Sequence, residues 1–490
     1  MTAPGVVAAL DIGTSSVRAI LFDTRGFPVP GAAARRPHHP QTGSDGAATL
    51  DPDALVDAAV SCLAEAINHA PGPLLGVASA TFWHSFLGLN REGRACTPVY
   101  LWSDTRSFGQ VETLRRRLDE REVHARTGCR FHTSYLPARL LWLRETDPAL
   151  FRKVTAWVSP GEYLCLKLFG ERRCSFSMAS GTGLLNQRSL VWDAELLEAL
   201  EVPVERLSPL TDEHEVLSQM RAPYASMLPA LAAIPWLLPL GDGACSNVGS
   251  GGVGPDRVTL MVGTSGAMRI LGAPVDAAPW GLWKYRLDRR RSLVGGALSN
   301  GGGVYRWMND VLKLPPLEQL EQFVASAEPD SHGLTVLPFL WGERSPDWYS
   351  HATGAILGLT AATRSEEIAQ ALLEAVAYRF MLVYRLLMAL APPDRRLIGS
   401  GAALGHSRAL AQMLADALGA PLTLTLEAEG TARGAALMML EQIAALQIDA
   451  APLDEGETLF PDAARHERYE RGLERHVAMA ERFLMKETNA

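Results

Sequence analysis

The stretch VVAALDIGTSSVRAI at residues 6–20 returns in altered form as VTLMVGTSGAMRI at residues 258–270. In both places an apolar run meets a short turn of glycine, threonine and serine, and a second apolar run follows. This order predicts a strand, a tight turn and a second strand. One such hairpin at the start of each half of the chain favours two related domains that face one another, although chance can also match short segments rich in glycine and serine.

The length of the chain also requires more than one domain. A chain of 490 residues and 53.0 kDa exceeds what a single hydrophobic core usually organises. The glycine-rich segment GDGACSNVGSGGVGPD at residues 241–256 comes just before the second hairpin. We therefore expect a boundary here, with one domain over residues 1–244 and another over residues 245–490.

Segments typical of helices and strands alternate over the rest of the chain, which indicates α/β architecture. A helix is predicted over residues 51–69, with its apolar side chains on one stripe and Asp51 or Asp53 near the N-cap. Further segments are predicted as a long buried helix over residues 366–390, a strand that ends near residue 398, a turn over residues 399–405, a helix over residues 406–418 and a surface loop over residues 31–48.

Composition and charge exclude several classes of protein. Hydrophobic residues make up 47% of the chain and charged residues 20%, so it is not a disordered, collagen-like or coiled-coil chain. The 54 acidic and 46 basic side chains give a formal net charge of −8, which offers no general attraction to nucleic acid or to anionic lipid. The six cysteines are scattered without a CxxC pair, which favours reduced thiols over a metal cluster or a disulfide framework.

No segment has the pattern of a targeting sequence or a membrane span. The first apolar run covers only residues 6–10 before it meets Asp11, and the longest apolar stretch, residues 227–240, is interrupted by prolines. A spanning helix needs about 20 consecutive apolar residues. We therefore expect a cytoplasmic protein that does not enter a membrane.

Three turns that contain glycine follow strand-like runs, at residues 11–18, 263–266 and 399–405. Glycine lets the backbone approach a ligand closely, and consecutive N–H groups together with threonine or serine hydroxyls can surround phosphate oxygens. None of the three has the Walker A spacing, and a single such turn is more often an ordinary hairpin. Three in one chain favour nucleotide binding, with Arg18 as a fixed positive charge for the transferring phosphoryl group.

Two aspartates stand at positions suited to metal binding and proton transfer. Asp11 ends a strand at a phosphate-type turn, where a carboxylate can hold Mg²⁺ directly or through water, whereas the second copy has Met261 near this position. Asp242 lies between Gly241 and Gly243, which suits a general base that takes the proton of an attacking hydroxyl. The alternative is an ordinary Asp-Gly turn, and the residues alone favour that alternative.

Taken together, these motifs resemble those of the FGGY family of carbohydrate kinases, within the actin-like ATPase superfamily. DIGTSSVR at residues 11–18 resembles the first phosphate motif of the family, GTSG at residues 263–266 the second, and the segment at residues 399–419 the adenosine motif. Other similar segments, in family order, are LWSDTR at residues 101–106, SNGGGVYRW at residues 299–307 and GERSPDW at residues 342–348. The resemblance implies two RNase-H-like domains that face each other across a catalytic cleft.

The resemblance also implies that the γ-phosphate of ATP is transferred to a hydroxyl of a small sugar or polyol, with Mg²⁺ as the metal. Asp242 then takes the proton of the acceptor, and Asp11 and Asp242 position the metal. The residues that the resemblance places around the nucleotide are Asp11, Thr14, Ser15, Ser16, Arg18, Gly263, Thr264, Gly302, Gly401, Ala402 and Gly405.

On the acceptor side, FWHS at residues 82–85 resembles the Met-His-Ser segment of gluconokinases and the Met-His of xylulose kinases. Trp83 and His84 are therefore expected to touch substrate hydroxyls, although Trp83 departs from the usual methionine. Asp104 and Arg106 either complete that wall or form a buried ion pair that fixes the loop.

The resemblance favours the gluconokinase branch at DGACSN (residues 242–247), GTSGAMR (residues 263–269) and SNGGGVYRW. Gly161 and Ser175 depart from that branch, where lysine and aspartate are more usual, so another polyol acid or a ketopentose is an alternative acceptor. A third hypothesis is a nucleotide-dependent sugar sensor that transfers no phosphate.

Members of the family are often dimeric, so a homodimer is compatible with the resemblance. Glu343 and Arg344 are interpreted as structural rather than catalytic.

Overall fold

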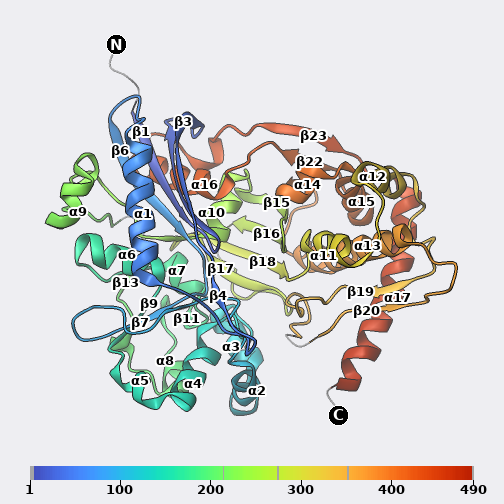
Figure 1. Ribbon diagram of the computed structural model, residues 1–490, viewed down its shortest axis with the longest axis horizontal. Helices are drawn as coiled ribbons and strands as arrows, with labels where there is room; N and C mark the ends of the chain where they lie inside the picture. Colours follow the sequence, from blue (N-terminus) through green and yellow to red (C-terminus); the bar gives the residue numbers. More distant parts are fainter. Residues whose placement is uncertain (1–4, 213–214, 273–274, 350–351, 488–490) are drawn as a thin grey trace.

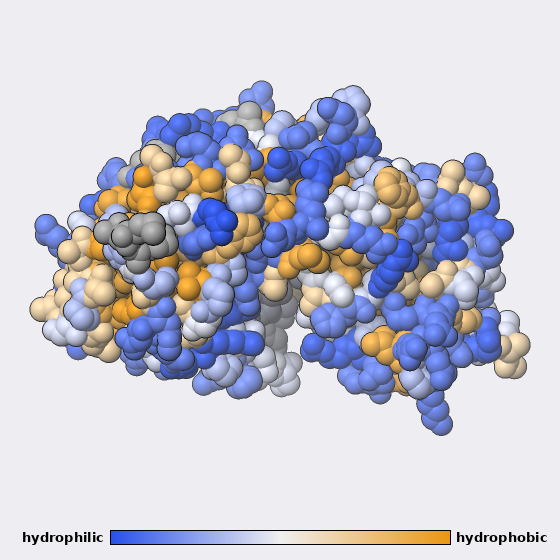
Figure 2. Space-filling view, turned by 90° about the horizontal axis from the view of Figure 1, so that it is seen from above, coloured by the Kyte–Doolittle hydropathy of each residue, from blue (hydrophilic) through white to orange (hydrophobic). Residues whose placement is uncertain are grey.

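A computed structural model of the chain describes residues 5–212, 215–272, 275–349 and 352–487. These residues form two α/β domains, each built on one large sheet (Figure 1). The space-filling view shows two lobes whose outline is notched between them (Figure 2). The prediction of two α/β domains is therefore confirmed.

The first sheet has five strands in the order β14-β6-β1-β2-β3. Strand β2 is antiparallel to both of its neighbours, β1 and β3, whereas β6 and β14 run parallel to β1. The bounds are β1 (Val6–Ile12), β2 (Ser16–Asp23), β3 (Pro28–Pro37), β6 (Leu74–Thr81) and β14 (Leu240–Gly241).

Strand β1 is central because both of its faces are buried. Val6, Ala8 and Leu10 pack in one apolar cluster with helix α1 (Pro52–Ile67), whereas Val7 and Ala9 pack in another with α16 (Gly430–Gln442). Alternate residues of a strand point to opposite faces of its sheet, so α1 and α16 cover the two sides of the first sheet (Figure 1).

The second sheet repeats the arrangement of the first. Its order is β17-β18-β16-β15-β21-β22-β23, in which β15, β16 and β18 are antiparallel and β21 and β22 run parallel to β15. Five neighbouring strands therefore match β3-β2-β1-β6-β14 in order and direction, so the repeated hairpin of the sequence belongs to a repeated fold. The bounds are β15 (Gly254–Val262), β16 (Gly266–Gly272), β17 (Trp283–Arg286), β18 (Ser292–Leu298), β21 (Arg396–Ser400), β22 (Leu422–Thr425) and β23 (Glu455–Leu459).

One face of the second sheet packs in a large apolar cluster with several helices of the second half of the chain. The other face contributes Leu271 and Leu293 to the cluster that also contains Val7 and Ala9 of β1, so this cluster joins the two sheets. The helices of the large cluster include α13 (Ser365–Leu387), α15 (Arg408–Leu418) and α17 (Ala463–Glu487), of which α13 and α15 contact the sheet directly.

A mainly helical insertion lies between β6 and β14 (Figure 1). It carries the segment that follows β6 and much of the wall of the cleft. Its helices include α2 (Phe108–Arg117), α3 (Glu120–Thr127), α4 (Leu136–Thr146), α6 (Pro160–Phe169), α7 (Phe176–Ser180), α8 (Ala194–Leu200) and α9 (Ala222–Met227). None of the described helices has the length and the apolar composition that crossing a bilayer requires.

Helix α10 (Asp242–Gly249) packs closely against α16, which follows β22 in sequence but lies on the first sheet. These two helices therefore link the two halves of the chain. Helix α10 spans the point between residues 244 and 245 where we place the domain boundary. The exact division of the chain stays a prediction.

Two local predictions are confirmed and two are correct only in part. Helix α1 is capped by Asp51, whose carboxylate accepts from the N–H groups of Asp53 and Ala54 at 2.9 Å, and the long buried helix is α13. Residues 399–405 are not all turn, because a short helix, α14 (Ala402–His406), starts after Gly401. Residues 31–48 are a surface loop only over residues 38–47, interrupted by the short β4 (Gln41–Thr42), because β3 continues to Pro37 and Ala32 and Ala34 point into the core. An edge strand tolerates the glycine and prolines that suggested a loop.

Candidate active site

A cavity of about 210 Å³ lies between the two domains. The first half of the chain lines it with residues that include Thr14, Trp83, His84 and Asp242, and the second half with Ser265 to Ala267, Arg269 and Arg344, among others. A cavity of about 450 Å³ adjoins it and shares Trp102, Ser134, Ser265 and Arg344 with it. The two phosphate-type hairpins therefore meet at one site.

Asp242 stands where β14 passes into α10, with its side chain on the wall of the cavity. Its Oδ1 accepts hydrogen bonds from the N–H of Gly243 at 2.8 Å and from the N–H of Trp83 at 3.4 Å. Its Oδ2 has no hydrogen-bond partner among the described residues. Burial raises the pKa of Asp242, against the lowering effect of the two N–H groups and of Arg269. A fixed carboxylate with one uncommitted oxygen and a raised pKa suits a general base.

Asp11 and Arg18 are paired across the first hairpin, in the register of β1 and β2. Arg18 Nε lies 3.9 Å from Asp11 Oδ2, while Arg18 Nη1 donates to Glu429 at 2.7 Å. Burial raises the pKa of Asp11 to about 7; Arg18 opposes this, and the charges of Asp242 and Glu429 add to it. The carboxylates of Asp11 and Asp242 repel one another and lie beside a Thr-Ser turn. Together they are a set of oxygen donors that fits Mg²⁺, because this ion prefers oxygen ligands.

The first phosphate-type turn is closed by a hydrogen bond from the N–H of Gly13 to the carbonyl of Ser16 at 3.0 Å. Thr14 faces the cavity and accepts a hydrogen bond from Trp102 Nε1 at 3.2 Å. Ser15 is exposed, whereas Ser16 is buried and its Oγ has no partner among the described residues. Of the three predicted hydroxyls, Thr14 is the one that lines the cavity.

Glycines of three segments meet at the second phosphate-type turn. The N–H of Gly302 donates to the carbonyl of Gly263 at 2.7 Å, and the N–H of Gly303 donates to the carbonyl of Thr264 at 2.9 Å. Gly401 has a φ of +98°, and a Cβ there would lie 2.5 Å from the carbonyl oxygen of Val262. Only glycine fits this position without strain. Gly263, Thr264, Gly302, Gly401 and Ala402, which were predicted from separate motifs, thus lie on adjoining segments.

Trp83 and His84 line the cavity together with Arg269 and Arg344, and their rings contact those of Tyr135 and Tyr285 in tilted and edge-on arrangements. His84 Nδ1 is 2.5 Å from the carbonyl of Gly181, so Nδ1 carries the proton and Nε2 can accept one hydrogen bond. Burial lowers the pKa of His84 to about 3. His84 is therefore neutral at physiological pH and suited to accept from a hydroxyl.

Arg139 holds the backbone of His84 in place. His84 has a left-handed backbone with φ of +65°, and its carbonyl accepts from Arg139 Nη2. The same guanidinium donates to the carbonyls of Leu101 at 2.8 Å and Tyr100 at 3.3 Å, and also to Ser134. No carboxylate pairs with Arg139 among the described residues, and burial lowers its pKa to about 9. A charged group that satisfies several carbonyls at once fixes the aromatic wall.

We expect Arg139→Met to lower the free energy of unfolding by about 3 kcal/mol, because the change leaves several buried carbonyls without a donor. The KM for the acceptor should also rise, since His84 loses its support. The matched control is Arg144→Met on the same helix, whose arginine pairs with the largely exposed Glu201. Its loss should cost about 0.5 kcal/mol. Urea unfolding of the two variants measures the difference. Equal midpoints would contradict the stabilising role of Arg139.

Asp104 and Arg106 form an ion pair away from the cavity. Arg106 Nη2 lies 2.6 Å from Asp104 Oδ2, and this oxygen also accepts from the N–H of Ala48 at 3.2 Å. Asp104 is only 1% exposed, and neither residue lines the cavity. Of the two alternatives, the ion pair that fixes the loop is the one that the geometry shows.

The two departures from the gluconokinase pattern also lie away from the cavity. A Cβ at Gly161 would lie 2.6 Å from the Cβ of Pro239 and 2.7 Å from Thr81 Oγ1, so no longer side chain fits without a shift. Ser175 Oγ donates to the carbonyl of Pro239 at 2.5 Å and caps α7. Both positions lie against Pro239, just before β14, and Asp242 directly follows that strand.

Sequence reasoning missed two arginines of the cavity wall. Arg269 follows the second phosphate-type turn on β16, and Arg344 was interpreted as structural. Its neighbour Glu343 pairs with Arg379 at 2.6 Å and also lines the second cavity. Arg344 faces both cavities. The position of Arg269 so soon after a phosphate-type turn is the signal that could have pointed to it.

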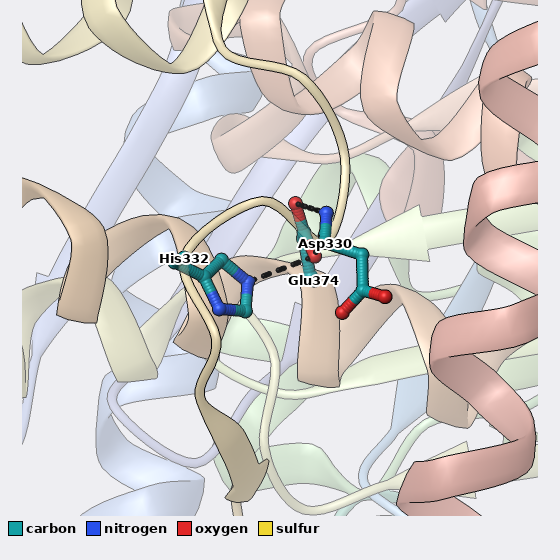
Figure 3. Close-up of side chains that lie close together, drawn as sticks. All are labelled: Asp330, His332 and Glu374. Atoms are coloured by element: carbon teal, nitrogen blue, oxygen red, sulfur yellow. Dashed lines mark hydrogen bonds and ion pairs between the residues drawn. The ribbon is translucent and has the colours of Figure 1, made fainter. Parts of the chain in front are cut away.

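Among the described residues, Asp330, His332 and Glu374 form a group of metal-ligand types outside the cavity (Figure 3). His332 Nδ1 accepts from the N–H of Leu334 at 3.0 Å, so Nε2 carries the proton that it donates to Glu374 at 3.1 Å. The carboxylate of Asp330 pairs with Arg475. Because the ligand atoms already have protein partners, the group acts as a brace between a loop and α13.

Comparisons with known proteins agree with this geometry. Residues 6–249 match the N-terminal domain of the FGGY family of carbohydrate kinases, and residues 258–440 match its C-terminal domain. A gluconokinase of Bacillus subtilis strain 168 is 27% identical over 445 residues, which cover 88% of this chain and 86% of that one. A xylulose kinase of Escherichia coli strain K12 is 27% identical over 478 residues, which cover 94% and 96%. The crystal structure of a gluconate kinase from Lactobacillus acidophilus superposes with a TM-score of 0.90 at 24% identity, over 98% of each chain.

Proposed function

The chain belongs to the FGGY family of carbohydrate kinases, and we propose that it transfers the γ-phosphate of ATP to D-gluconate, forming 6-phospho-D-gluconate. The observation that carries this proposal is the placement of Asp242. Its carboxylate is fixed by two N–H groups on the wall of a cavity that both phosphate-type hairpins reach. The match to gluconokinases supports the choice of gluconate.

In the proposed mechanism, Asp242 accepts the proton of the acceptor hydroxyl as that oxygen attacks the γ-phosphorus. His84 Nε2 accepts from a second hydroxyl and so orients the acceptor. The segments at Gly263, Gly302 and Gly401 receive the nucleotide. Asp11 and Asp242 would hold Mg²⁺, which supplies positive charge to the phosphate oxygens when bound.

Nucleotide binding can be tested at Gly405 without a change in stability. A Cβ at Gly405 would meet no atom within 4 Å, so Gly405→Leu extends into open space where we place the nucleotide. We expect the Kd of ATP to rise at least about tenfold with an unchanged melting temperature, since a clash with the ligand removes more than about 1.4 kcal/mol of binding. The control is Gly109→Leu on helix α2, where open space also surrounds the Cβ and φ is not positive. Equal ATP affinities in the two variants would contradict the placement of the nucleotide beside Gly405.

A xylulose kinase is the second candidate, because the Escherichia coli xylulose kinase is as similar in sequence as the gluconokinase. A coupled assay of ADP release decides between them, with Mg-ATP and with D-gluconate, D-xylulose, L-ribulose, glycerol and other sugar acids as acceptors. The proposal predicts the highest kcat/KM for D-gluconate. A higher value for D-xylulose would keep the mechanism and replace the acceptor. ATP binding without ADP release on any acceptor would favour a sensor.

A further inference from the structure

The charge of the cavity wall is unbalanced. Its charged side chains are one carboxylate, Asp242, and two guanidiniums, Arg269 and Arg344, while His84 is neutral. The pKa of Arg269 is lowered to about 10, mainly by burial, with Asp242 opposing and Arg344 adding to the effect. Two positive groups thus lie close enough to repel one another, with one negative group to offset them.

Both guanidiniums have donors to spare. Arg269 is 8% exposed, and its buried Nε and Nη1 have no hydrogen-bond partner in the described part of the chain. Arg344 donates from Nη2 to the carbonyl of Leu298 at 3.1 Å, but its buried Nε is also without a partner in the same residues. Neither arginine lies within ion-pair distance of a described carboxylate.

Two other buried arginines, Arg379 and Arg139, have carboxylate or carbonyl partners within the protein. Arg379 pairs with Glu343 at 2.6 Å and with Asp347 at 2.7 Å, and Arg139 donates to a ring of carbonyls. An unpaired buried charge is costly, and it is best explained where a ligand completes the pair. A carboxylate fits, because a guanidinium binds it through two parallel hydrogen bonds.

We propose that Arg269 and Arg344 bind the carboxylate of the acceptor, and that this pair makes the enzyme selective for sugar acids over neutral sugars and polyols. This inference rests on the proposed kinase function and names the substrate class of the same site. The hydroxyl that receives the phosphate then lies at Asp242, and the charged end of the acceptor lies at the two guanidiniums.

The test compares D-gluconate with D-gluconamide, which has the same hydroxyls and no charge. We expect the wild-type protein to prefer gluconate by about 100-fold in kcat/KM, the size expected for hydrogen bonds between charged groups. Arg269→Met and Arg344→Met should each reduce this preference at least tenfold, mainly through lost activity on gluconate. The control Arg106→Met removes an arginine that is already paired with Asp104, and it should leave the preference unchanged.

Equal kcat/KM for the two acceptors in the wild-type protein would overturn the inference. So would an equal loss on both acceptors in the variants, because the arginines would then serve the transferring phosphate. Isothermal titration of the wild-type protein with each acceptor measures the same preference without turnover. A protein that releases no ADP but binds gluconate about 100-fold more tightly than gluconamide would therefore refute the kinase proposal and retain the carboxylate site.

Discussion

Asp242→Asn is expected to lower kcat by at least about 10²-fold, the usual contribution of a general base. Asparagine keeps the size of the side chain, and its carbonyl oxygen can still accept from the N–H groups of Gly243 and Trp83. The fold and the affinity for ATP should therefore change little. What is lost is the oxygen that takes the proton of the acceptor.

Asp11→Asn is the informative comparison for this experiment. We place Asp11 at the metal and not at the acceptor, so its variant should regain activity as the concentration of Mg²⁺ is raised. Asp242→Asn should not recover in the same titration, because no metal ion replaces a proton acceptor. Steady-state rates at several Mg²⁺ concentrations separate the two roles. Normal turnover of Asp242→Asn would remove this residue from the base role.

Gly434→Ala should produce a large loss of stability. A Cβ at Gly434 would lie 1.8 Å from the carbonyl oxygen of Cys245, so α16 and α10 touch through their backbones. The contact is reciprocal, because a Cβ at Gly249 would lie 1.8 Å from the carbonyl oxygen of Gly430. One methyl group must push the helices apart, which should cost about 3 kcal/mol of folding free energy.

Because α10 begins at Asp242, the same shift should also displace the general base and lower kcat. The control is Gly430→Ala, one turn earlier on α16, where a Cβ would lie 3.1 Å from the hydroxyl of Ser250, a side chain that can rotate away. Alanine gains up to about 1 kcal/mol in helix propensity over glycine, so this variant should be neutral or slightly stabilised. Calorimetric melting of both variants gives the comparison, and similar midpoints would contradict the close contact.

Local patterns were enough to predict the repeated hairpins and their glycines. The turn at residues 263–266 and the capped helix α1 depend on neighbours in sequence, and both form as expected. Strand β3 was missed because its glycine and prolines suggest a loop, while its place at the edge of the sheet depends on β2. Helix α14 was missed because a glycine-rich segment hides a single helical turn.

The cavity wall was harder to predict because its members come from distant segments. Trp102, Tyr135, Arg269 and Arg344 are far apart in the chain and meet only when the two domains face one another. Asp104 and Arg106 show the reverse case. The sequence left substrate contact and a buried ion pair open for these two residues, and in the structure each is paired with the other inside a loop.

The central claim is that the γ-phosphate moves to the acceptor, and the most direct measurement identifies the product. The protein is incubated with Mg-ATP and uniformly ¹³C-labelled D-gluconate, and ³¹P and ¹³C NMR spectra are recorded while ADP is quantified. The account predicts one phosphate ester, at carbon 6 of gluconate, for each ADP formed. ADP without a phosphate ester, or no ADP with gluconate or any other acceptor, would contradict it.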